Sequence, residues 1–309
     1  MLTPWFKKLV TLVNLYGGFC NAHLHLDRTD TLKNDDWDLS LKEKQQKIER
    51  INGPESFRRI TRTAAIYLTW FKQNGYRSAY TCVDTSPQIG SLFFDALVFA
   101  RDMVNFDLKI AAYSPGGLDT TEKRQAFEKI LPQADFICTL PERDSDFIKH
   151  CDYVFDQATI ADKDVQMHID QENTPRGRDL ETLCSYLGQN NFGGRVWAVH
   201  AISMGCYSEI RFENLVNDLL KTNVGVICCP SAALGMAQDR SWYAPIHNSI
   251  TRVKELYMAG VPVRLGSDNI CDMFSPTSTP DLLQEIMLAS NAVRYYDVEA
   301  WARMASETM

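Results

Sequence analysis

The chain has 309 residues, of which 45% are apolar and 23% are charged, so a folded domain with a sizeable core is expected rather than a disordered chain. The net charge of −7 argues against nucleic acid or a membrane surface as the main partner, and no apolar stretch reaches the roughly 18 residues of a membrane span. The nine cysteines include no C-x-x-C pair, which predicts reduced, mostly buried thiols and a cytoplasmic protein.

Short β-rich runs alternate along the chain with segments of helical pattern. Most runs are continuously apolar, as in parallel strands buried on both faces, and they cover 17–26, 76–86, 108–115, 135–142, 165–170, 195–203, 224–232 and 261–268. Helical spacing predicts helices at 57–75, 91–104, 178–190, 207–222, 250–260 and 281–296. The pattern predicts one α/β domain over 1–309, a (β/α)8 TIM barrel. A doubly wound open sheet is the alternative, but no glycine-rich phosphate turn follows the first run.

A long polar segment from Thr29 to Ser56 joins the first strand to its helix. In a barrel it would lie over the catalytic face, as a lid or as a solvated insertion. Of the six histidines, His150 is expected on the surface, whereas His247 is expected in a loop, where it lines the pocket or caps a helix.

The remaining histidines and one aspartate fall at strand ends, where a TIM barrel places its catalytic groups. His23 and His25 are two residues apart, so on a strand both side chains point to the same side. His168 and His200 end the fifth and sixth runs, and Asp268 ends the eighth. Because imidazoles and a carboxylate suit Zn²⁺ or Fe²⁺ with an open position for water, the sequence predicts a catalytic metal site.

The motifs at these positions resemble the amidohydrolase superfamily. They are NAHLHLDR (21–28), MHID (167–170), AVHAIS (198–203) and LGSDN (265–269). The stretch ITRVKELYMAGVPVRLGSDNICDMFSP (250–276) is more specifically similar to the cytosine deaminase-like branch. This branch includes triazine hydrolases, such as N-isopropylammelide isopropylamidohydrolase, that remove amino or alkylamino groups from s-triazine rings. The resemblance runs from about Gly17 to about Met304 in the order of the strands.

The resemblance implies a hydrolase with one divalent metal per chain, Zn²⁺ in preference to Fe²⁺. The positions that match the metal ligands are His23, His25, His168 and Asp268. Binuclear relatives bridge two metals with a carboxylated lysine at the end of the fourth strand, where this chain has no lysine. The resemblance also implies catalytic roles for Asp268, which takes a proton from the attacking water, and for His200, which contacts the developing tetrahedral centre.

Four further positions are expected to bind the substrate: Arg28, Glu142, Gln171 and Asn269. Cytosine deaminases carry a proton-shuttling glutamate at the position of Gln171, and a glutamine can orient a ring amide but cannot ionise. Its neighbours Asp170 and Glu172 are expected to point elsewhere.

Glu142 replaces a glutamine of the branch and favours a donor-rich or cationic substrate edge, unless it is a solvent-facing loop acid. Arg28 suits a carbonyl-rich or anionic substrate or leaving group, unless it forms a salt bridge with Asp30 or another loop acid. Asn269 is placed to hydrogen-bond the substrate.

The branch normally wraps its barrel with a small β-sandwich built from both chain ends. Only about 17 residues precede the first strand here, so we expect the sandwich to be absent or vestigial, and exposed barrel surface would favour a homo-oligomer. The expected function is metal-dependent deamination or dealkylamination of a small pyrimidine- or triazine-like heterocycle. The alternatives are hydrolysis of a cyclic amide at the same site and a non-catalytic relative that binds a metal or ligand.

Overall fold

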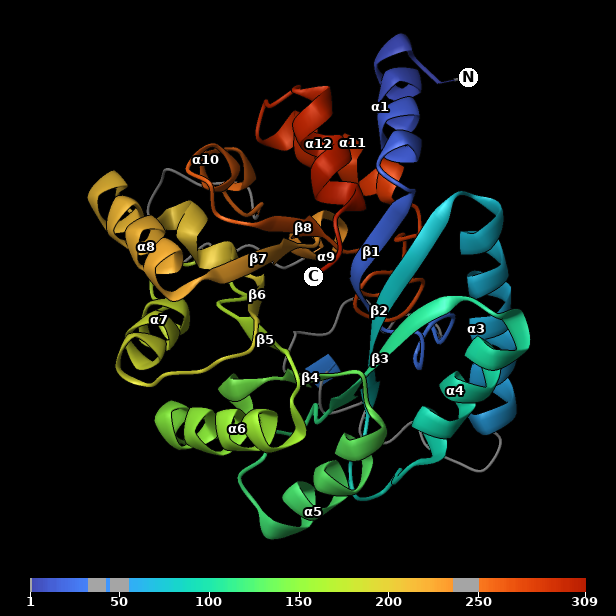
Figure 1. Cartoon of the computed structure of the whole chain (residues 1–309), viewed down its shortest axis with the longest axis vertical. Coiled ribbons are helices and arrows are strands. Elements are labelled where there is room, and N and C mark those ends of the chain that lie inside the picture. Colours follow the sequence, from blue (N-terminus) through green and yellow to red (C-terminus); the bar gives the residue numbers. More distant parts are fainter. Residues whose placement is uncertain (1, 33–42, 45–55, 236–249) are drawn as a thin grey trace.

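A computed structural model of the chain describes residues 2–32, 43–44, 56–235 and 250–309. Eight parallel strands form one sheet in the order β1 to β8, which curves into a barrel (Figure 1). The strands are β1 (Phe19–Leu24), β2 (Tyr76–Asp84), β3 (Asp107–Tyr113), β4 (Phe136–Thr139), β5 (Val165–Ile169), β6 (Val196–His200), β7 (Val224–Cys228) and β8 (Val263–Leu265). The predicted TIM barrel is confirmed, and each predicted run contains one strand, except that β3 begins one residue before its run.

Helices follow the strands and surround the barrel (Figure 1). Six occupy predicted segments: α3 (Ser56–Gln73), α4 (Leu92–Val104), α7 (Asp179–Gln189), α8 (Glu209–Thr222), α10 (Val253–Met258) and α11 (Leu282–Ala292). Five lie outside them: α1 (Pro4–Leu15), α5 (Thr121–Ile130), α6 (Phe147–Ala161), α9 (Pro230–Leu234) and α12 (Val298–Ser306). Short 3₁₀ turns are η2 (Leu131–Gln133), η3 (Pro141–Arg143) and η4 (Ile202–Cys206). Within the described residues, none of the helices has the length and apolar composition that crossing a bilayer requires.

The core has an outer layer between sheet and helices and two small clusters inside the barrel. Helix α3 shows how the outer layer forms, because its buried residues Ile60, Ala64, Leu68 and Phe71 recur at helical spacing and face the sheet. The inner clusters gather around Tyr80 on one side and Trp197 on the other. With both faces of the strands covered, their sequences read as continuous apolar runs.

The seam between β1 and β8 closes the barrel where the candidate ligands lie. Leu24 pairs with Asp268 across it, and the backbone N–H of Asp268 donates to the carbonyl of His23 at 2.9 Å. A Cβ at Gly266 would lie 2.6 Å from that same carbonyl oxygen, so only glycine allows β8 to approach β1 this closely. The pairing of β1 with β2 also shifts register between Asn21 and Leu24, and such irregularities re-aim side chains at the ends of strands.

The prediction of a surface position for His150 is wrong. The residue is buried, and its Nδ1 lies 2.6 Å from Asp144 Oδ2. His150 lies on the inner side of α6 with Cys151, Val154 and Ala158, and the carboxylate provides a partner for its Nδ1 there. Most of the segment predicted as a lid or insertion, and also His247, lie outside the described residues.

Candidate metal centre

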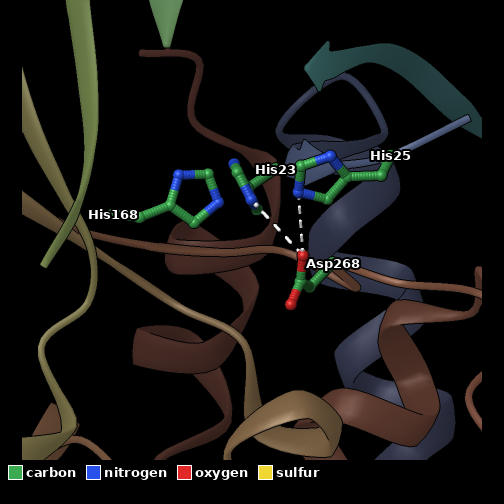
Figure 2. A group of neighbouring side chains, drawn as sticks. All are labelled: His23, His25, His168 and Asp268. Atoms are coloured by element: carbon green, nitrogen blue, oxygen red, sulfur yellow. Dashed lines mark ion pairs between the residues drawn. The ribbon is translucent and has the colours of Figure 1, made fainter. Parts of the chain in front are cut away.

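Three imidazoles and one carboxylate meet at the carboxyl ends of β1, β5 and β8 (Figure 2). One potential ligand atom from each side chain lies within 4.8 Å of all the others, and the four residues are buried. Asp268 Oδ1 is the point of convergence, at 3.5 Å from His23 Nε2 and 3.2 Å from His25 Nε2. In Figure 2, His168 faces this group from the strand on the opposite side. The structure therefore brings together all four residues that the sequence predicted as ligands.

Hydrogen bonds at the far nitrogens orient two of the imidazole rings. His23 Nδ1 lies 2.7 Å from Gln166 Oε1, and His168 Nδ1 lies 3.1 Å from the carbonyl oxygen of Thr139. Both partners are acceptors, so each Nδ1 carries a hydrogen, and each Nε2 has a lone pair directed into the site when the ring is neutral. This is the arrangement that second-shell partners impose on metal-binding histidines.

The donor set fits a divalent metal ion on two observations. Buried atoms without a hydrogen-bond partner among the described residues gather here, namely His23 Nε2, both ring nitrogens of His25 and Asp268 Oδ1. Unpaired buried polar atoms are costly, and a cation satisfies several at once. Ligand atoms at about 2.1 Å from a tetrahedral zinc ion lie about 3.4 Å apart, close to the two measured N···O separations of 3.2 and 3.5 Å.

The electrostatics favour neutral imidazoles facing an ionised carboxylate. Burial lowers the pKa values of His25 and His168 well below the ordinary value. The charge of Arg28 lowers the pKa of His25 further, and the neighbouring histidines do the same for His168. Burial opposes ionisation of Asp268, yet His23 and His25 hold its pKa well below the usual range. His23 differs, because Cys82 and Asp268 outweigh its burial and raise its pKa to about 10, so metal binding would release a proton there.

His200 lies beside the four residues, with its Nε2 3.9 Å from Asp268 Oδ2. Burial lowers its pKa to about 4, which keeps the ring neutral near pH 7. His200 and Asp268 both have left-handed backbone conformations, with φ of 75° and 55°. Such conformations cost about 1 to 3 kcal/mol in non-glycine residues and concentrate at functional sites. Both residues predicted to be catalytic therefore have left-handed backbone conformations, as do eight other non-glycine residues of the described chain.

Two predicted substrate-binding residues, Arg28 and Asn269, converge on a third side chain, Asp272. Asn269 Nδ2 donates to Asp272 Oδ2 at 2.6 Å, and Arg28 Nε lies 3.7 Å from the same oxygen. The other carboxylate oxygen accepts the backbone N–H groups of Phe274 and Ser275. The salt bridge that was one reading of Arg28 therefore forms with Asp272 and not with Asp30.

The other two predicted substrate-binding residues pair across the ends of β4 and β5. Gln171 Nε2 donates to Glu142 Oε1 at 2.9 Å, and Glu142 is exposed. Asp170 points away from this pair, as predicted, because its carboxylate accepts the backbone N–H groups of Asp179 and Leu180 at the start of α7.

Sequence reasoning missed several side chains that contact the site. Asp272 lies four residues beyond Asp268, and the only feature of the sequence that could have indicated its role is its position in the same motif. Gln166 lies two residues before His168 and so points to the same side of β5. Cys82 Sγ and Cys138 Sγ lie 3.7 and 3.6 Å from the Nδ1 atoms of His23 and His168, and nothing in the sequence distinguishes these two thiols from the other cysteines.

No model of a known protein family matches this chain. An uncharacterized protein of Haemophilus influenzae is 26% identical over 254 residues, which cover 78% of this chain and 90% of the relative. A pterin deaminase of Rhizobium rhizogenes is 24% identical over 111 residues, or 36% of this chain and 25% of the deaminase.

Several solved structures are similar over almost the whole chain. The 5-methylcytosine deaminase of Klebsiella pneumoniae superimposes with a TM-score of 0.81 at 23% identity, covering 93% of this chain and 72% of the deaminase. N-isopropylammelide isopropylaminohydrolase of Burkholderia multivorans gives a TM-score of 0.70 at 20% identity, covering 93% and 72%. A mutant atrazine chlorohydrolase of Arthrobacter aurescens, complexed with zinc and atraton, gives 0.67 at 15% identity, covering 94% and 69%. The chain therefore shares its barrel fold with these deaminases and hydrolases, in agreement with the fold that its motifs predicted.

Proposed function

We propose that this protein is a metal-dependent hydrolase that cleaves a carbon–nitrogen bond of a small nitrogen heterocycle, by deamination or dealkylamination. The observation that carries the proposal is the buried convergence of three imidazoles and one carboxylate with unpaired polar atoms between them. The substrate class is supported by the names of the similar proteins, which include deaminases of pterin and 5-methylcytosine.

The proposed cofactor is one divalent ion, with Zn²⁺ favoured and Fe²⁺ as the alternative. Four-coordinate nitrogen and oxygen ligation suits zinc, and a similar solved structure contains that metal. The side chains that would hold it are His23, His25, His168 and Asp268. When bound, such an ion lowers the pKa of a water molecule so that hydroxide is accessible at neutral pH.

The chain's own residues would handle the protons. The Asp268 carboxylate is ionised and can accept a proton from the attacking water on Oδ2, the oxygen that faces His200. The distance of 3.9 Å between Oδ2 and His200 Nε2 is too long for a direct hydrogen bond, so both groups are available to a reacting atom between them. A neutral His200 can donate to the oxygen that develops negative charge on the attacked carbon.

The pair after β4 and β5 suggests which edge of the ring is recognised. Gln171 cannot ionise, and its amide N–H is directed to Glu142. A carboxylate accepts hydrogen bonds, so Glu142 favours a ring edge that carries N–H groups. Arg28 and Asn269, held by Asp272, would contact a carbonyl group of the substrate.

The test combines metal analysis with a substrate panel. The purified protein is expected to contain about one zinc or iron per chain and to release ammonia or an amine from at least one aminopyrimidine, triazine or pterin. Asp268→Ala should abolish turnover and reduce metal content. Ring opening without free amine would favour a cyclic amide hydrolase instead, and a fully metallated protein inert on the whole panel would favour a non-catalytic relative.

A further inference from the structure

Gln166 is fully buried inside the barrel, and both polar atoms of its side-chain amide have hydrogen-bond partners. Its Nε2 donates to the carbonyl oxygen of Ala22 at 2.9 Å and lies 2.9 Å from Met309 Sδ. Its Oε1 lies 2.7 Å from His23 Nδ1. Reversing the amide would place Nε2 against the ring and Oε1 against the carbonyl oxygen of Ala22, which leaves two acceptors facing each other. The orientation of Gln166 is therefore fixed by β1 itself.

We propose that Gln166 is a positioning residue for the metal centre, which holds His23 as the tautomer with hydrogen on Nδ1 and with Nε2 directed toward Asp268. This inference rests on the proposed function, because it concerns the metal site of that activity. The 2.7 Å contact is at the short end of the range for a hydrogen bond donated by an imidazole N–H, and His23 and Gln166 are both fully buried. In such an environment one buried hydrogen bond decides the tautomer and the direction of the ring.

Gln166 also keeps His23 out of a competing site. His23, Cys82 and Cys138 each offer a ligand atom within 4.8 Å of the others and form a second group of potential metal ligands, in which Cys82 Sγ lies 3.7 Å from His23 Nδ1. Thiolates with an imidazole attract soft ions such as Cd²⁺. While Nδ1 carries a hydrogen bonded to Gln166, it has no lone pair for an ion held by the two thiols. The amide therefore favours metal binding by the three histidines and Asp268 over metal binding by His23 and the two thiols.

Met309 completes the enclosure of this amide. Its side chain packs against both inner clusters of the barrel, and in Figure 1 the chain reaches this residue at the centre of the ring of strands. Its sulfur is a weak acceptor, so the strong interactions of Gln166 remain those with Ala22 and His23.

The test measures the zinc affinity of the metal-free protein by competition with a chromophoric chelator. Gln166→Met fills the space but offers no comparable acceptor, and it should weaken zinc binding about 10- to 100-fold. Gln166→Glu keeps an acceptor at His23, and burial keeps a proton on its other oxygen, which can still donate to the carbonyl of Ala22. Its zinc affinity should stay within about threefold of that of the parent protein. Cys20→Ala serves as the matched control, because Cys20 is buried on the same strand as His23 and its hydrogen bond is to Ser78. It should not change the affinity.

A second readout uses cadmium, whose thiolate complexes absorb in the ultraviolet. Gln166→Met should gain this absorption with one equivalent of Cd²⁺, and adding Cys82→Ser should remove it. Thermal unfolding of the metal-free proteins checks the fold, and Gln166→Asn, whose shorter amide cannot span the same distance, replaces any variant that unfolds. If the folded Gln166→Met and Gln166→Asn variants bind zinc as tightly as the parent, the inference about Gln166 is overturned and the proposed function is not affected. A parent protein that binds no zinc or iron would overturn the proposed function and this inference together.

Discussion

Replacing Gly266 by alanine tests whether the close approach of β8 to β1 builds the metal centre. The added Cβ would lie 2.6 Å from the His23 carbonyl oxygen and 2.8 Å from the His23 Cβ, whereas ordinary contacts begin at 3.4 Å. The two strands must therefore separate by about 0.8 Å at the seam, which is overpacking of a kind that costs about 1 to 3 kcal/mol. The hydrogen bond from the Asp268 N–H to the same carbonyl would lengthen beyond its range, at a further cost of about 1 kcal/mol.

The same displacement moves Asp268 away from both histidines of β1. We expect zinc affinity to fall about 10- to 100-fold, together with a loss of about 2 to 4 kcal/mol in the free energy of unfolding. Chelator competition and urea unfolding measure the two effects. Gly188→Ala is the matched control, because Gly188 lies in α7 with open space around its position, and alanine there should be neutral or stabilising by up to about 1 kcal/mol. Parent-like zinc affinity and stability in Gly266→Ala would refute the reasoning.

Three further predictions concern buried polar groups. Burial raises the pKa of Glu285 from 4.5 to about 8, so the folded state keeps a proton that the unfolded state releases, and stability is lost as the pH rises from about 4.5 to about 8. The free energy of unfolding of Glu285→Gln should therefore rise relative to that of the parent by up to about 1.4 kcal/mol per pH unit across this range. Urea unfolding measures this, and a difference between the two proteins that does not change with pH would contradict the prediction. Asp272→Ala should release Arg28 and Asn269 and lower kcat/KM about 10- to 100-fold, whereas loss of the metal instead would show that Asp272 acts on the ligands. His200→Asn should lower kcat about 100- to 1,000-fold with metal content unchanged, and an unaffected kcat would remove His200 from the mechanism.

The amino-acid sequence is sufficient to predict the alternation of strands and helices and the residue types at the strand ends. Both are local properties, because a parallel strand buried on two faces requires an apolar run, and the end of such a strand is visible where polar residues begin. Every predicted run overlaps a strand, and all four predicted ligand positions meet. Among the helices that the periodicity did not reveal, α5 and α6 carry charged residues between their buried ones.

The side chains that support the site become visible only once the chain has folded. Gln166 and His23 are 143 positions apart, and their contact depends on the closure of the barrel and on an amide orientation that no local pattern encodes. The burial of His150 against Asp144 and the partnership of Arg28 with Asp272 likewise depend on how side chains orient after the helices and loops have packed. Local periodicity thus predicts which face a residue occupies, whereas its partner follows from the packing of distant segments.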